Sequence, residues 1–282
     1  LFDTVKAVGA ELCRDLGIAI PVGKDSLSMR TQWTDKDGEY QVVAPLSLVV
    51  TAFAPVHDVR RHLTPQLRRI DERSHLLLLD IGEGSNRLGG SCLAQAFDRH
   101  GGEVPDLDFP QRLKSFFKAI QSLSEQGLIL AYHDRADGGL LATVAEMMFA
   151  GRLGASLQLP GSERDLLGLL FNEELGGVIQ IAGSEMARAH EVLEDNGAGW
   201  VDIGTVEADD QLSIYNDDEV VLRIDRIRMQ REWSETTYRL QSLRDNPVTA
   251  KEEFDRLLDV DDPGLSVRLT FDSSGDVAAP LV

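Results

Sequence analysis

Tyr132-His133-Asp134-Arg135-Ala136-Asp137-Gly138-Gly139-Leu140 joins a run of strand-forming residues, 128–132, to a helix-forming run that Gly151 closes. A carboxylate at a strand end can hold Mg²⁺, and two glycines at a helix start let backbone N–H groups approach a phosphate. The same residues suit a plain helix start, with Asp137 as the cap and Asp134 in solvent. The spacing leaves both interpretations open.

The segments on either side of this junction alternate between strand and helix patterns. Upstream, residues 76–80 predict a strand, glycines follow between 82 and 90, and residues 92–97 predict a helix. A second helix begins at Pro110 and ends before Gly127. Downstream, strands are expected at 178–181, 200–206, 212–215 and 220–224, with a helix at 185–193. The middle of the chain is therefore an α/β mixture.

The two ends of the chain follow different patterns. A helix is expected from Phe2 to Leu16, then a loop at 23–29, a hairpin around Asp37-Gly38, and a buried strand at 46–53. A charged, proline-interrupted stretch predicts a boundary near residue 71, and the pattern turns helical again from Asp225. We expect three parts, 1–70, 71–225 and 226–282, with the acidic last thirty residues forming an irregular linker. The amino terminus looks cut, since it lacks Met and a targeting pattern.

Composition narrows the function classes. The formal net charge is −19, so the average surface repels a phosphate backbone and nucleic acid is not an expected partner, although a local site can still bind ATP. No apolar run approaches a membrane-spanning length, so no membrane partner is expected either. Only Cys13 and Cys92 occur, without a CxxC pair, which favours a reducing, cytoplasmic location.

Other segments carry weaker signals. The loop from Gly82 to Ser91 lacks the spacing of known phosphate loops, so a tight structural turn is favoured. The loop Gly23–Ser28 suits phosphate, metal or solvent equally. Cys92, with His133 or His100 as its base, only superficially resembles a nucleophile, because a cysteine beside small apolar residues more often packs. The histidine spacings make a zinc site improbable, and the arginines at 223, 226, 228 and 231 suit a solvated helix face or ion pairs.

Four landmarks in order carry a resemblance to a known family. They are Gly23-Lys24-Asp25-Ser26-Leu27-Ser28-Met29, His133 to Leu140, Phe171-Asn172-Glu173-Glu174-Leu175-Gly176, and Trp233-Ser234-Glu235-Thr236-Thr237 with Leu243-Arg244-Asp245-Asn246-Pro247. The chain resembles the large, single-chain phosphoribosylformylglycinamidine synthases. The resemblance covers nearly the whole chain and identifies it as an internal fragment around the second C-terminal subdomain of the aminoimidazole ribonucleotide synthetase type. It implies an α+β fold with a mixed sheet flanked by helices, preceded by part of an N-terminal-type subdomain.

The resemblance also implies an activity and a site. The family converts formylglycinamide ribonucleotide, glutamine and ATP to formylglycinamidine ribonucleotide, ADP, phosphate and glutamate, acting with the remaining domains of the same chain. Asp134 matches the family's Mg²⁺ ligand, and Ala136, Gly138 and Gly139 lie where ATP or ADP is bound. Position 136 is a serine in the family, so only a backbone contact remains here. The fragment alone is expected to be inactive, without a catalytic residue of its own, and to bind Mg-ADP weakly.

Two alternatives differ in class. The first is a non-catalytic structural module whose Mg-nucleotide holds subdomains together. The second is a relative in the same superfamily, such as a selenophosphate synthetase or a thiamine-phosphate kinase, which should carry its own catalytic amino-terminal segment. This chain offers no room for that segment.

Overall fold

A computed structural model describes residues 1–24, 26, 28–56, 58–99, 101–159, 163–262, 264, 267–272, 275 and 279. The chain divides into two compact units, Leu1–Arg226 and Ile227–Val282. The finer division at residues 70 and 225 stays a prediction. In the part of the chain that the structure describes, no helix has the length and apolar character needed to cross a membrane.

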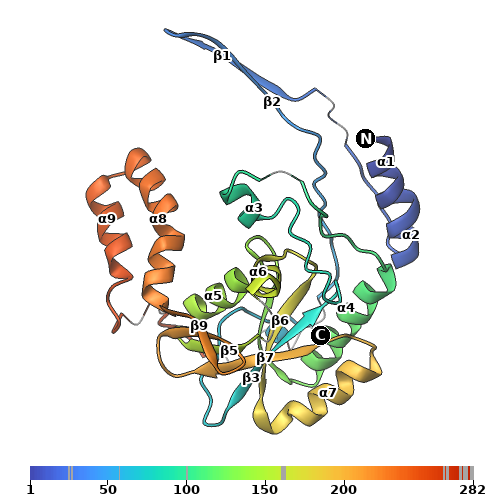
Figure 1. The fold of residues 1–282 in the computed structure, drawn as a ribbon, viewed down its shortest axis with the longest axis vertical. Coiled ribbons are helices and arrows are strands. Elements are labelled where there is room, and N and C mark those ends of the chain that lie inside the picture. The colour runs from blue at the N-terminus through green and yellow to red at the C-terminus, as the bar shows by residue number, and fades with distance from the viewer. Residues whose placement is uncertain are drawn as a thin grey trace. The chain divides into compact units, whose positions relative to one another are not determined.

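A seven-stranded sheet organises the first unit (Figure 1). Its strand order is β4-β6-β3-β7-β5-β8-β9, and all neighbouring strands are antiparallel except the parallel pair β5 and β8. The predicted mixed sheet flanked by helices is confirmed. The strands are β3 (Ser74–Asp80), β4 (Ile129–Asp134), β5 (Gly154–Gln158), β6 (Gly176–Ala182), β7 (Val201–Glu207), β8 (Gln211–Asn216) and β9 (Glu219–Asp225).

Helices pack on the sheet because successive strand residues point to opposite faces. Leu77 and Leu79 of β3 share a buried cluster with side chains of α4 (Pro110–Glu125) and α7 (Met186–Asp195). The helix α5 (Gly139–Gly151) packs against strands β4, β5 and β6 and against α6 (Glu163–Phe171). Its buried residues, such as Leu140, Val144 and Met147, lie outside the α4 and α7 cluster. The short elements are α3 (Cys92–Ala96) and η3 (Gly183–Glu185).

The first sixty residues contain a helix and a hairpin, as predicted. The helix runs through α1 (Phe2–Val5), η1 (Lys6–Leu12) and α2 (Cys13–Leu16), and Gly17 ends it with φ 74°. The hairpin pairs β1 (Arg30–Asp35) with β2 (Gly38–Val43). A short turn, η2 (Val59–Arg61), follows. Asp25 and Leu27 of the 23–29 loop, together with His57 and His100, lie outside the described residues.

The expected buried strand at 46–53 is wrong. These residues form no strand in the described structure, and Val49 and Phe53 are 89% and 93% exposed. Apolar residues form a strand only when a neighbouring strand accepts their backbone hydrogen bonds. The nearest hairpin does not supply one, because β1 and β2 pair with each other. The segment is as apolar as a buried strand, but no strand of the described structure pairs with it.

The second unit is a pair of helices, α8 (Arg226–Arg244) and α9 (Pro247–Arg256). Tyr238 stacks on Phe254 at 4.4 Å between ring centroids, and the guanidinium of Arg231 lies 4.0 Å from the same ring. Asn246 caps α9 by accepting a hydrogen bond from the Val248 amide at 2.9 Å. The helix α9 ends at Arg256, so its last turn lies within the last thirty residues, which were expected to be irregular.

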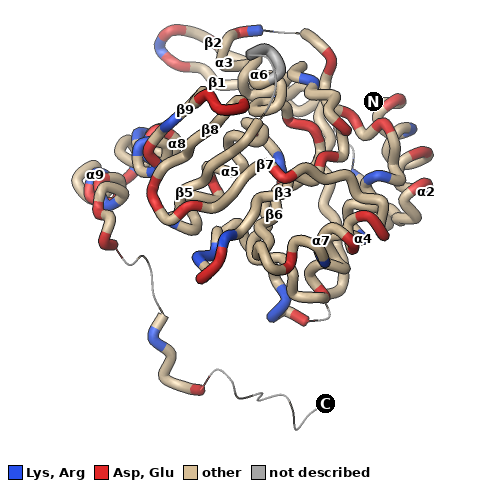
Figure 2. The backbone as a smooth tube through the Cα atoms, turned by 60° about the horizontal axis from the view of Figure 1, so that its bottom comes forward, with Lys and Arg blue, Asp and Glu red and all other residues tan. Residues whose placement is uncertain are grey.

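Acidic residues are spread along the whole chain, with lysines and arginines scattered among them (Figure 2). The sequence has 47 acidic and 28 basic side chains. Of the arginines expected on a solvated helix face or in ion pairs, Arg226 is buried in an ion pair, with its Nε 2.6 Å from Oδ1 of Asp210. The net negative charge repels anions at a distance, so any phosphate would have to be held by local donors.

Candidate functional site

The turn between β4 and α5 holds all four residues predicted to form the site. Asp134 is the last residue of β4, Ala136 lies in the turn, Gly138 is the N-cap, and Gly139 is the first residue of α5. Gly138 and Gly139 have φ angles of 84° and 68°, which favour glycine. No side chain caps this helix among the described residues, so Asp137 is not the cap that the plain interpretation required.

Asp134 presents an exposed carboxylate at the end of its strand. The hydroxyl of Tyr132 donates a hydrogen bond to Oδ1 of Asp134. Burial, and then this hydrogen bond, raises the pKa of the Tyr132 phenol, so the hydroxyl remains a donor at neutral pH. Among the described residues, Oδ2 of Asp134 accepts no hydrogen bond, which leaves an oxygen able to bind a hard cation.

The buried side chain of Arg135 holds the β4–α5 turn in place. Sequence reasoning missed this residue. Its side chain is buried, and Nε donates to the carbonyl of Glu174 at 2.7 Å. Nη2 lies 2.5 Å from Oδ1 of Asp80. The Arg135 amide donates to the carbonyl of Gly176 at 2.9 Å. These contacts hold the β4–α5 turn against the end of β3 and against the 172–176 turn.

Two polar side chains of the 172–176 turn, Asn172 and Glu174, are buried. Nδ2 of Asn172 donates to the carbonyl of Gly168 at 2.7 Å and to Oδ1 of Asn86 at 3.0 Å. The carboxylate of Glu174 is 1% exposed, and Oε1 lies 2.6 Å from Nε of Arg87. A Cβ at Gly176 would lie 2.3 Å from the carbonyl oxygen of Leu79, so this close approach requires glycine.

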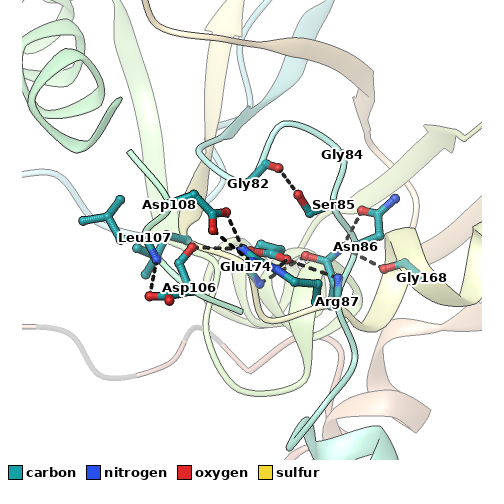
Figure 3. A network of polar contacts seen from close by, with 12 residues as sticks. Gly82, Gly84, Ser85, Asn86, Arg87, Asp106, Leu107, Asp108, Gly168 and Glu174 are labelled. Carbon is teal, nitrogen blue, oxygen red and sulfur yellow. Dashed lines mark hydrogen bonds and ion pairs between the residues drawn. The ribbon is translucent and has the colours of Figure 1, made fainter. Parts of the chain in front are cut away.

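The glycine-rich loop at 82–91 is held by the same residues. The Asp80 carboxylate accepts hydrogen bonds from the amides of Gly82 at 3.2 Å and Gly84 at 2.7 Å. The hydroxyl of Ser85 donates to the carbonyl of Gly82 at 2.7 Å (Figure 3). Arg87 also reaches Asp108 with Nη2 at 3.1 Å. Several loop amides, including those of Gly82, Gly84 and Arg87, are therefore already engaged, as in a structural turn.

The Gly138 amide at the start of α5 already binds a carboxylate. Oε1 of Glu173 accepts hydrogen bonds from the amide of Gly138 at 2.9 Å and from the amide of Cys92 at 2.8 Å. The Gly139 amide donates to the carbonyl of Ala136 at 3.0 Å. An internal carboxylate thus occupies a helix N-terminus, a position that commonly binds anions. The residues of the β4–α5 turn fit a Mg-nucleotide in charge and donor type, provided that the Glu173 side chain moves away from the Gly138 amide.

Cys92, Asp137 and Glu173 form a cluster whose ligand atoms lie within 4.8 Å of one another. Partial burial, followed by the hydrogen bond and charge of Glu173, raises the pKa of the Cys92 thiol. A thiol beside two carboxylates stays protonated at neutral pH, whereas a nucleophilic cysteine needs an electropositive setting. His133 is engaged elsewhere, with Nε2 lying 2.7 Å from Oε2 of Glu146. The geometry does not favour a nucleophile at Cys92.

A separate hollow of about 320 Å³ lies over the opposite edge of the sheet. Glu207, Asp209, Tyr215 and Arg223 are among its lining residues, which come from β7, β8, β9 and the turn after β7. Asp134 lies on β4, the other edge strand. The hollow is not part of the candidate site.

Two family models match the sequence. The model described as AIR synthase related protein, C-terminal domain, matches residues 76–217, about half of the 282 residues. The model described as FGAR-AT PurM_N-like domain matches residues 1–55. The first match contains the β4–α5 turn, the 82–91 loop and the 172–176 turn. All the residues predicted to form the site therefore lie inside a segment typical of one family.

Three solved structures are similar to this chain at low sequence identity. Phosphoribosylformylglycinamidine synthase II from Thermotoga maritima is 15% identical, with 67% of this chain and 28% of that chain covered and a TM-score of 0.47. The Thermotoga maritima PurL complexed with FGAR is 16% identical, over 60% and 29% of the two chains, at 0.46. The hydrogenase maturation protein HypE in complex with ATP is 16% identical, over 59% and 55%, at 0.40. The chain spans less than a third of the length of the two Thermotoga proteins.

Proposed function

The chain belongs to the AIR synthase related protein family, and we therefore propose that it forms part of a phosphoribosylformylglycinamidine synthase. The match of residues 1–55 to the FGAR-AT PurM_N-like model supports this choice within the family. The proposed reaction of the longer protein uses formylglycinamide ribonucleotide, glutamine and ATP in purine biosynthesis. The remaining domains of that protein are the proposed partners, and the isolated chain is proposed to be inactive.

The proposed local role is to bind Mg-ATP or Mg-ADP at the β4–α5 turn. Asp134 would hold Mg²⁺, which usually takes one or two protein carboxylates and completes its shell with phosphate oxygens and water. The amide of Gly138 and the backbone at Ala136 and Gly139 would face the phosphates. When bound in such an enzyme, ATP supplies the energy that activates the amide oxygen of the substrate. The residues of this chain contribute binding and orientation.

One observation carries this proposal. The exposed Asp134 carboxylate lies at a strand end, four residues before the N-cap Gly138, whose amide already binds a carboxylate oxygen. A cation ligand beside an anion-binding position is the arrangement that a Mg-nucleotide requires. The methyl side chain of Ala136 offers no hydrogen bond, so only its backbone could contact the nucleotide.

The test is a thermal shift of the purified chain with ADP, in the presence and absence of Mg²⁺. A ligand that binds only the folded state adds about 1.4 kcal/mol at ten times its Kd. We expect the wild type to be stabilised by millimolar Mg-ADP and less by ADP alone. Asp134→Asn should lose the Mg²⁺-dependent part of the shift. Asp195→Asn, an exposed carboxylate on α7, is the matched control for the lost charge.

The outcomes separate the proposal from plain helix capping. An equal shift in the wild type and Asp134→Asn would mean that the carboxylate holds no metal. The same loss in both variants would mean that net charge, not position, governs binding. Glutamine-dependent ATP hydrolysis by the chain alone would contradict the proposed inactivity.

A further inference from the structure

Glu173 joins two segments through a single oxygen. Its Oε1 accepts one hydrogen bond from Gly138, at the start of α5, and one from Cys92, directly after the 82–91 loop. Both donors are backbone N–H groups, which side-chain substitution at those positions would not remove. A carboxylate oxygen with two amide donors is bound much as a phosphate oxygen would be.

Glu173 and its neighbour Glu174 point to different partners. Glu174 is buried and held by Arg87, so the backbone of the 172–176 turn is anchored. Glu173 is only partly buried, and its two cluster neighbours, Cys92 and Asp137, are exposed. Its side chain can therefore swing toward solvent by rotation about its own bonds, while the turn beneath it stays in place.

Electrostatic repulsion prevents a second anion from binding the two amides while Glu173 occupies them. The carboxylates of Asp137 and Glu173 have oxygens within 4.8 Å, so this corner already carries two acidic groups. A third anion on the same amides would meet strong repulsion in addition to lacking a donor. The two N–H groups can accordingly donate to Glu173 or to an external phosphate, but not to both.

We propose that Glu173 is an internal competitor for the phosphate position, so that a nucleotide binds at the β4–α5 turn only by displacing the Glu173 side chain. This rests on the proposed function, which supplies the ligand. Displacement would also free the Cys92 amide from Glu173. Occupancy of the nucleotide site would then be coupled to the contact between the 82–91 loop and α5.

The test is isothermal titration of the wild type, Glu173→Gln and Asp137→Asn. The probes are Mg-ADP and, separately, inorganic pyrophosphate without metal. Glu173→Gln keeps the shape of the side chain but replaces a charged acceptor with a neutral one, which holds the amides less strongly. We expect it to bind both probes about tenfold more tightly than the wild type. Asp137→Asn removes the same charge from the same cluster without freeing an amide, so its gain should be much smaller.

A second measurement needs no variant. In the amide NMR spectrum of the wild type, pyrophosphate should shift the Gly138 and Cys92 resonances together, because both lose the same acceptor. Competition is overturned if Glu173→Gln binds no more tightly than the wild type, or gains no more than Asp137→Asn. It is also overturned if no probe binds any variant or moves these two amides.

The two proposals fail differently. If Mg-ADP binding depends on Asp134 but not on Glu173, the proposed function holds and the competition is wrong. If pyrophosphate binding improves in Glu173→Gln while Asp134→Asn leaves Mg-ADP binding unchanged, Glu173 competes for an anion but the proposed metal-nucleotide site is wrong.

Discussion

Arg87 holds the carboxylate of Glu174 with two nitrogens: Nε lies 2.6 Å from Oε1, and Nη2 lies 2.8 Å from Oε2. The Arg87 amide donates to the same Oε1 at 3.2 Å. A fork of this kind fixes both the distance and the orientation of the two groups. It fastens the 82–91 loop to the 172–176 turn (Figure 3), so the candidate site rests on a rigid base.

Glu174→Gln should weaken this base without changing its shape. The amide nitrogen of glutamine would face a donor of Arg87, which leaves a buried donor pair unsatisfied. We expect the melting temperature to fall by roughly 5–10 °C, as followed by circular dichroism. Glu191→Gln, on the exposed face of α7, should change it little. Similar melting temperatures for both variants would show that the Arg87 pair contributes no stability.

Local sequence patterns predicted most elements of the sheet unit. The helix α4 was found from Pro110 at its start, Gly127 beyond its end and an apolar stripe between them. The strands β3 and β6 were found as short apolar runs, and both are buried on both faces. These features depend on residues close together in the chain, which is why a single sequence revealed them.

Elements that depend on distant partners were missed. The strand β5 has only Ala155 and Leu157 as apolar residues, and its identity comes from pairing with β7 and β8. The helix α6 was missed as well. The reverse error occurred at 46–53, where a strand-like sequence has no partner strand in the described structure. Propensity alone cannot distinguish these cases.

The candidate site was predicted only in its outline. Asp134 and the two glycines follow from the strand–turn–helix order, and their roles stay predictions. Arg135 and Glu173 could not be assigned, because their side-chain partners lie 35 to 81 residues away in the sequence. The adjacent glutamates at 173 and 174 were a signal in the family landmark, but their opposite roles depend on side-chain directions that the sequence does not give.

Tyr132→Phe should weaken Mg²⁺ binding without emptying the site. Phenylalanine has no hydroxyl to orient the Asp134 carboxylate. Loss of a hydrogen bond to a metal ligand typically costs about tenfold in metal affinity. Titrating Mg²⁺ at fixed ADP should show this loss, while binding of ADP without metal stays unchanged. Because its raised pKa keeps the phenol protonated, the effect should persist from neutral to mildly alkaline pH. Tyr40→Phe, in the hairpin, is the control, and equal losses of ADP binding with and without metal would indicate a packing defect instead.

Gly139→Ala should be strongly destabilising. A Cβ at this position would lie 2.6 Å from the carbonyl oxygen of Asn172, and the φ of 68° is unfavourable for alanine. Backbone atoms cannot move aside as a flexible side chain can, so we expect a cost of about 2–4 kcal/mol in urea denaturation. Gly9→Ala, in a helix with open space around the new methyl, should be neutral or stabilising. A neutral Gly139→Ala would mean that the 172–176 turn can retreat from α5.

Cys92 reports directly on the charge of its neighbours. Partial burial and the carboxylates of Glu173 and Asp137 raise the thiol pKa, so less thiolate is present at any given pH than in a free cysteine. In a Cys13→Ser background, alkylation by iodoacetamide should be slower than that of a cysteine peptide at pH 8. Its rate should also keep rising with pH where the peptide has levelled off.

Glu173→Gln removes the larger of the two charge effects on the thiol, so its pKa should fall toward the ordinary value and alkylation at pH 8 should accelerate. Asp137→Asn should have the same sign and a smaller size, because Asp137 contributes less. A rate profile in Glu173→Gln that matches the Cys13→Ser parent would mean that the carboxylate lies away from the sulfur in solution. The amides of Gly138 and Cys92 would then lack the Glu173 acceptor, and the physical basis for competition with phosphate would be lost.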